Sequence, residues 1–118
     1  MAHPGRGRVH TARAHRSIPR RAECRLLNRQ SEELAFVPDM FWSAVSFQDA
    51  PIIVNIEGET RTWKIPVSQV AGITVVTSYR IREVESNVLW EILSVDKPSD
   101  HTWHCVCVKM TEHDGLVP

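Results

Sequence analysis

VLWEILSVDKPSDHTWHCVCVKM, residues 88–110, is the stretch of this 118-residue sequence that decides the fold class. Two runs rich in aromatic and β-branched residues, 88–95 and 101–110, flank the turn-forming DKPSD at 96–100. In the second run, alternation places four side chains on one face of a strand, namely those of His101, Trp103, Cys105 and Cys107. The stretch therefore predicts two antiparallel strands joined by a short turn.

The same strand pattern continues upstream to residue 51. PIIVNIEGETRTWKIP (51–66) has two β-branched runs around Glu57-Gly58-Glu59, which predicts a hairpin whose second arm has Trp63 and Ile65 on one face with Arg61. The connector 67–72 is predicted to form about one helical turn. The run 73–84 and the turn-like 85–87 then lead into the strand at 88.

Strands at this spacing, with no long helix between them, predict a mainly β fold. We expect a small antiparallel β-barrel or sandwich of about five strands and no βαβ arrangement. Four tryptophans can fill much of its core: Trp42, Trp63, Trp90 and Trp103.

The N-terminal region differs sharply in charge from the rest of the chain. Residues 1–30 hold eight arginines and one acid, for a net charge of +7, and the remainder carries −7. Few large aliphatic residues occur there, so we expect residues 1–38 to form a basic, disordered arm, 39–112 the β-domain and 113–118 a tail. Residues 31–47 fit either a short helical turn or an extended lead-in, because Pro38 would stop a helix.

The arm suggests candidate contact residues for nucleic acid or a protein partner: Arg20, Arg21, Arg25 and Arg29. In a helix, three of these would form a single stripe, and no aromatic residue interleaves with them in sequence. The arm also fits an import presequence, which would place the protein in the mitochondrial matrix. A third possibility is translated upstream sequence without a role, with the true start near Met40.

The late cysteines could belong to a metal site, a redox centre or a core. Cys105 and Cys107 on a regular strand lie too far apart for one tetrahedral zinc, and a disulfide between them would be strained. A metal site would need His101 or His113 as well, and Cys24 falls in the expected arm. We therefore predict structural cysteines and no metal or cofactor, and the odd cysteine count favours a reducing compartment.

No other motif predicts catalysis. The sequence lacks the usual phosphate-binding, metalloprotease and hydrolase signatures. Glu83 and Glu91 could face each other across a hairpin like a glycosidase pair, although exposed solubilising acids are the better interpretation. Without an apolar run long enough to span a membrane, we expect a soluble intracellular protein of the cytoplasm or of a virion, with no membrane partner.

Residues 61–110, RTWKIPVSQVAGITVVTSYRIREVESNVLWEILSVDKPSDHTWHCVCVKM, resemble the small β-barrel head–tail joining proteins of tailed phages and prophages. The resemblance lies in four strand-like runs: 61–65, 80–84, 89–95 and 103–109. The Gly-Asp that commonly precedes the run corresponding to 80–84 is replaced here by Ser78-Tyr79. The resemblance implies a ring-forming connector without catalytic residues that acts through strand edges and flexible loops.

Three functions follow in order of preference. The first is a non-enzymatic protein-binding or assembly module, a homo-oligomer or part of a larger assembly of protein subunits, of the head–tail connector kind. The alternative is a nucleic-acid-associated protein, such as an organellar ribosomal subunit, that uses the Arg-rich arm. A small metal-binding enzyme or redox protein is third.

Overall fold

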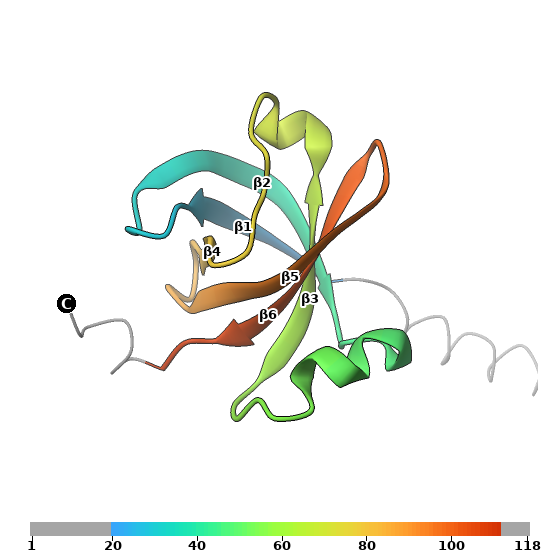
Figure 1. Cartoon of the computed structure of the whole chain (residues 1–118). Helices are drawn as coiled ribbons and strands as arrows, with labels where there is room; N and C mark the ends of the chain where they lie inside the picture. The colour runs from blue at the N-terminus through green and yellow to red at the C-terminus, as the bar shows by residue number, and fades with distance from the viewer. Residues whose placement is uncertain (1–19, 112–118) are drawn as a thin grey trace, which may run out of the picture.

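The computed structural model describes residues 20–111, which form a closed barrel of six antiparallel strands in the order β1-β2-β3-β6-β5-β4 (Figure 1). The strands are β1 Arg20–Leu27, β2 Glu33–Ser43, β3 Thr60–Pro66, β4 Arg80–Glu83, β5 Leu89–Ser99 and β6 Thr102–Lys109. Two short 3₁₀ helices, η1 Phe47–Ile53 and η2 Val67–Val70, follow β2 and β3. The prediction of a small, mainly β, antiparallel fold is confirmed, with six strands in place of about five.

Two strands, β1 and β2, lie upstream of the predicted strands, and β1 corrects the predicted boundary of the basic arm. Cys24 and Leu26 on β1 are buried in the barrel, and β1 pairs with both β2 and β4 to close it. The prediction of a disordered arm is therefore wrong for residues 20–38, and the part of it that covers residues 1–19 lies outside the described residues. Because β1 and most of β2 precede Met40, a chain that started there would lack a wall of the barrel.

β2 shows why residues 31–47 were ambiguous. Val37 and Met40 both point into the core although they are three residues apart, because a register shift lies between the Ala22 and Cys24 pairings. The two exposed residues between them, Pro38 and Asp39, form this bulge. Proline has no N–H to donate, so a bulge is a position in a strand where it is tolerated.

The hairpin of β5 and β6 is confirmed, and other predicted strands are shorter than expected. The strand predicted for the first arm of the 51–66 hairpin is wrong, because Phe47–Ile53 forms η1. Only the second arm is a strand, β3. Of the predicted strand 73–84, only Arg80–Glu83 pairs with its neighbours, whereas the predicted helical turn in the 67–72 connector is present as η2. β5 itself extends through most of the predicted turn to Ser99.

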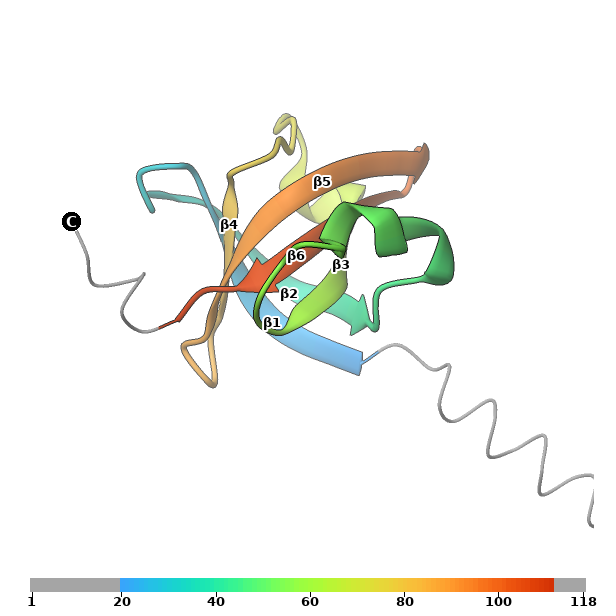
Figure 2. The same cartoon turned by 60° about the horizontal axis from the view of Figure 1, so that its bottom comes forward.

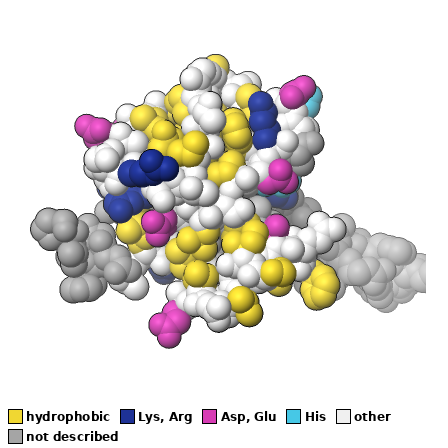
Figure 3. Space-filling model, in the orientation of Figure 1, with side chains coloured by type: hydrophobic (Ala, Val, Ile, Leu, Met, Phe, Trp, Pro, Cys, Tyr) yellow, Lys and Arg dark blue, Asp and Glu magenta, His cyan; other side chains and the backbone are white. Residues whose placement is uncertain are grey.

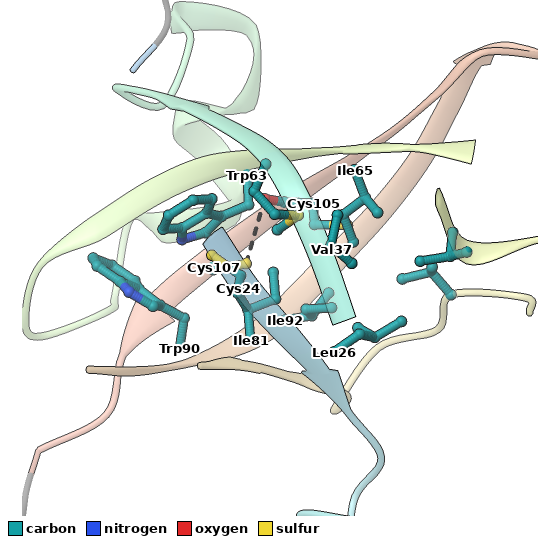
Figure 4. Close-up of a cluster of buried hydrophobic side chains, with 13 residues drawn as sticks. Cys24, Leu26, Val37, Trp63, Ile65, Ile81, Trp90, Ile92, Cys105 and Cys107 are labelled. Carbon is teal, nitrogen blue, oxygen red and sulfur yellow. Dashed lines mark hydrogen bonds between the residues drawn. The ribbon is translucent and has the colours of Figure 1, made fainter. Parts of the chain in front are cut away.

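The core lies inside the barrel, where strand alternation directs it. Trp63 and Trp90 are fully buried and pack edge to face, with ring centroids 6.0 Å apart, while Trp42 and Trp103 are partly buried against the core. The three cysteines join this core beside Ile81 and Ile92 (Figure 4). Burial of the two complete indoles contributes a large share of the hydrophobic stabilisation, since each covers roughly 200 Å².

One end of the barrel is marked by aromatic and charged side chains, and we call it the tryptophan end. At this end β1, β3 and β5 begin, and β2, β4 and β6 finish. The side chains that gather there are those of Trp42, Arg61, Trp63, Glu83 and Trp90. Val70 of η2 and Val75 are buried and belong to the core cluster.

Among residues 20–111, none of the helices has the length and hydrophobicity that a membrane span requires.

Candidate functional site

The arginines predicted as contact residues occupy three different places. Arg21 and Arg25 lie on β1 opposite Phe41 and Phe36 of β2, on the outer face of the barrel. Arg20 begins β1 at the tryptophan end, with its guanidinium 5.3 Å from the ring centre of Trp42. Because β1 is a strand, the helical stripe of Arg21, Arg25 and Arg29 does not form.

Arg29 lies apart from the others, in the turn between β1 and β2. Its guanidinium Nη2 donates a hydrogen bond of 3.3 Å to the carbonyl oxygen of Thr77. It therefore fastens the turn to the segment before β4. The structure does not bring it together with Arg21 and Arg25 on one surface.

Aromatic rings do interleave with the arginines, although they come from the neighbouring strand. The guanidinium of Arg21 lies 4.9 Å from the ring centre of Phe41, and that of Arg25 lies 5.3 Å from that of Phe36. Arg82 of β4 pairs directly with Arg25 across the other side of β1. We call this surface the Arg–Phe face: Arg21, Arg25, Phe36, Phe41 and Arg82.

The Arg–Phe face is a mixed surface with a basic excess. Glu33 accepts a 2.8 Å hydrogen bond from Arg25, and Glu23 lies on β1 between the two arginines. The described barrel as a whole is slightly acidic, because residues 20–111 contain ten Lys or Arg and twelve Asp or Glu. A surface of this kind lacks the concentrated positive charge that nucleic-acid binding usually requires.

The three cysteines form one buried cluster. Cys24, Cys105 and Cys107 are fully buried, and the Cys107 thiol donates to the carbonyl oxygen of Cys105 at 3.4 Å (Figure 4). Burial raises the pKa of Cys24 and of Cys105 to about 12 and raises that of Cys107 as well. Neutral thiols are poor nucleophiles and poor metal ligands, so this environment suits packing.

A metal site at the late cysteines finds no support in the described part of the chain. In residues 20–111, no group of three His, Cys, Asp or Glu side chains is placed to hold a metal ion. His101 is exposed in the turn between β5 and β6, and His113 lies outside the described residues. The expectation that Cys24 would be remote from the other two is wrong, because β1 carries it into their cluster.

The tryptophan end contains the most unusual electrostatic arrangement. The Arg61 guanidinium carbon lies 3.5 Å from the ring centre of Trp42 and 4.5 Å from that of Trp90. Arg61 Nη1 lies 3.6 Å from Glu83 Oε2, and the same oxygen accepts a 2.8 Å hydrogen bond from Trp90 Nε1. The side chains of Arg61 and Glu83 are only 17% and 16% exposed. This cluster closes the barrel with a shielded ion pair.

Glu83 and Glu91 do not form the carboxylate pair considered from the sequence. Glu91 pairs with Arg80 on the outside, whereas Glu83 shares the inner face with Ile81 and Trp90. The interpretation of both acids as exposed and solubilising is also wrong for Glu83. Because the carboxylate of Glu83 already contacts Arg61 and accepts a hydrogen bond from Trp90, Glu83 is poorly suited to act as a free acid or base.

A hollow of about 420 Å³ lies beside this cluster. Its wall combines Trp42 and Pro38 with charged residues of both signs; the lining residues are Arg21, Ala22, Glu23, Pro38, Trp42, Glu83, Glu85 and Ser86. The polar side chains of this lining that could contact a ligand are those of Arg21, Ser86 and the three glutamates.

The segment between β2 and β3 exposes large apolar side chains. Phe47 is 94% exposed and Val54 75%, and Ile52 and Ile56 are also exposed. No residue of η1 is buried. The segment lies next to β3 and β6 in both views (Figures 1 and 2), and Asp49 is close enough to act electrostatically on His104 of β6. We call residues 44–59 the apolar segment.

Figure 3 shows the consequence for the surface. Hydrophobic side chains occur in both the upper and the lower parts of this view, including the lower part where η1 lies in Figure 1, and basic side chains stand at the left and at the upper right.

Comparison of the chain with models of protein families, with characterised proteins and with solved structures finds no match.

Proposed function

We propose that this chain is a non-catalytic assembly subunit that associates with other protein subunits, including further copies of itself, in the manner of a head–tail connector. The observation that carries the proposal is the exposure of the apolar segment, above all of Phe47 and Val54. A contiguous exposed apolar surface marks an interaction site, because water solvates it at a free-energy cost that a partner removes. Burial of Phe47 alone would contribute about 1.5–3 kcal/mol.

We place the contact on the side chains of a loop. Within residues 20–111 every strand has two partners, and β2 and β5 pair with β3 and β4 over only three residues each. The sequence resemblance to connectors implied contacts through edges and loops. The apolar segment supports the loops, because it contains four of the seven large hydrophobic residues that are exposed in residues 20–111.

Sedimentation velocity of the full chain over a wide concentration range tests this function. We expect concentration-dependent association, and we expect the double substitution Phe47→Ser with Val54→Ser to shift the protein toward monomer. Gln48→Ser, which changes an exposed polar side chain of the same segment, is the matched control and should leave the distribution unchanged. A wild-type chain that stays monomeric at every concentration would refute the proposal.

A further inference from the structure

The apolar segment and the Arg–Phe face are complementary in two properties. The apolar segment contains Asp49, Glu57 and Glu59 and no Lys or Arg, so it is both acidic and hydrophobic. The Arg–Phe face presents three arginines together with two phenylalanines, of which Phe36 is 43% exposed. Opposite charge and shared apolar character are the features by which two protein surfaces recognise each other.

The two surfaces lie on different strands of the barrel. The apolar segment lies at β3 and β6, and the Arg–Phe face spans β1, β2 and β4. They are neighbours where β2 pairs with β3, but the arginines of the face lie on β1 and β4, which do not pair with β3 or β6.

We infer that the apolar segment of one copy docks on the Arg–Phe face of a second copy. This inference rests on the proposed function and names its partner. The contact is heterologous, because it joins two different surfaces, and the resulting pair keeps one free surface of each kind. Repetition of such a contact produces a closed ring when the rotation between neighbours closes and an open filament when it does not.

The arrangement of the Arg–Phe face suits such a partner. The guanidinium carbons of Arg21 and Arg25 lie 4.9 and 5.3 Å from phenylalanine ring centres, and one N–H group of Arg25 donates to Glu33. Their other N–H groups can donate to carboxylates of an incoming segment. Arg25 and Arg82 stand directly opposite each other, and acidic side chains of a neighbouring copy would add to the neutralisation that Glu33 provides.

Complementary single-face variants test the inference in the full chain. One variant carries Phe47→Ser and Val54→Ser and keeps the Arg–Phe face; the other carries Arg21→Glu and Arg82→Glu and keeps the apolar segment. We expect each to lose association by at least tenfold and to be monomeric alone. Mixed together, they should form a 1:1 heterodimer and no larger species, since each retains one working surface.

The outcomes separate this inference from the proposed function. If wild type associates and the Arg21→Glu, Arg82→Glu variant associates equally well, the docking surface is wrong and the assembly function stands. If both variants are monomeric but their mixture yields no heterodimer, the contact is not heterologous and the inference fails. If wild type does not associate, the proposed function fails as well.

Two controls guard the interpretation. Lys97→Glu makes one such charge reversal on an exposed residue near the turn of the β5–β6 hairpin and should leave association unchanged. Circular dichroism establishes that each variant is folded. If Arg82→Glu disturbs the pairing of β4, Phe36→Ser on β2 removes the exposed ring of the face and should give the same loss of association.

Discussion

Replacement of Arg61 by methionine should destabilise the barrel strongly, because it leaves Glu83 shielded without its cation. Methionine fills much of the same space, so the change removes charge more than volume. Removal of one partner from a buried ion pair costs about 3–5 kcal/mol. The loss includes the stacking of the guanidinium on Trp42 and Trp90, at 3.5 and 4.5 Å from their ring centres, since a shielded cation–π contact contributes up to about 2 kcal/mol.

The substitution of Glu83 by glutamine separates the charge from the hydrogen bond. The amide oxygen can still accept from Trp90 Nε1, whereas Arg61 keeps only Glu59, at 3.3 Å, as an anionic partner. Glu59 is 51% exposed, so solvent screens its contribution. We expect Glu83→Gln to cost about 1–3 kcal/mol and Glu59→Gln, the matched control, less than about 1 kcal/mol.

The double variant Arg61→Met with Glu83→Gln completes a thermodynamic cycle. Replacement of both charges is commonly close to neutral, so the double variant should be more stable than the sum of the single effects predicts, by about 1–3 kcal/mol. Urea unfolding followed by tryptophan fluorescence measures this, because three of the four tryptophans surround Arg61. Strictly additive effects would refute the conclusion that the two charges form one energetic unit.

Two further predictions concern the thiols and the N-terminal strands. Because burial raises the pKa of Cys24 and Cys105 from 9.0 to about 12, the folded state keeps protons that the unfolded state loses above pH 9. The free energy of unfolding should then fall between pH 9 and 12 by about 1.4 kcal/mol per pH unit for each thiol. Urea unfolding across this range measures the slope. Cys105→Ala should make the slope shallower, and a slope that this variant leaves unchanged would contradict the prediction. A chain shortened to residues 40–118 should show no cooperative unfolding by circular dichroism, while a chain of residues 20–118 should retain it; a folded 40–118 chain would disprove the role of β1.

The strands from β3 onward could be predicted because their alternation includes large side chains. Trp63 and Ile65 on β3 and Trp90 and Ile92 on β5 mark the inner face in sequence as they do in the structure. The confirmed hairpin of β5 and β6 follows from the same signal. The wrong prediction of a strand for the first arm of the 51–66 hairpin has the same origin, because its β-branched residues are typical of a strand but find no pairing partner.

For β1, amino-acid composition and alternation predict different structures. Its inward residues Ala22, Cys24 and Leu26 alternate with Arg21, Glu23 and Arg25, a period-two pattern that predicts a strand with one wet face. Two of the three inward residues are small, so the composition of the segment predicts no contribution to a core. Small residues suffice there because Trp63 and Trp90 fill the volume from the other wall.

The Arg–Phe face and the Arg61 cluster could not be predicted, because both depend on contacts between distant segments. Arg21 and Phe41 are separated by twenty residues and meet only through the register of β1 and β2, which the bulge at Pro38 shifts. Arg61 and Glu83 belong to strands that do not pair with each other and meet across the interior of the barrel. Sequence spacing carries no information about either contact.

The separation of the core from the apolar segment makes assembly and folding independently testable. Every residue of the core cluster lies outside residues 44–59, so substitutions in that segment remove no core packing. The effects of Phe47→Ser and Arg61→Met on the stability of the monomer should therefore be additive within about 0.5 kcal/mol. Coupling above that level would mean that the segment packs on the barrel in solution, and its exposed side chains would then no longer be evidence for a partner.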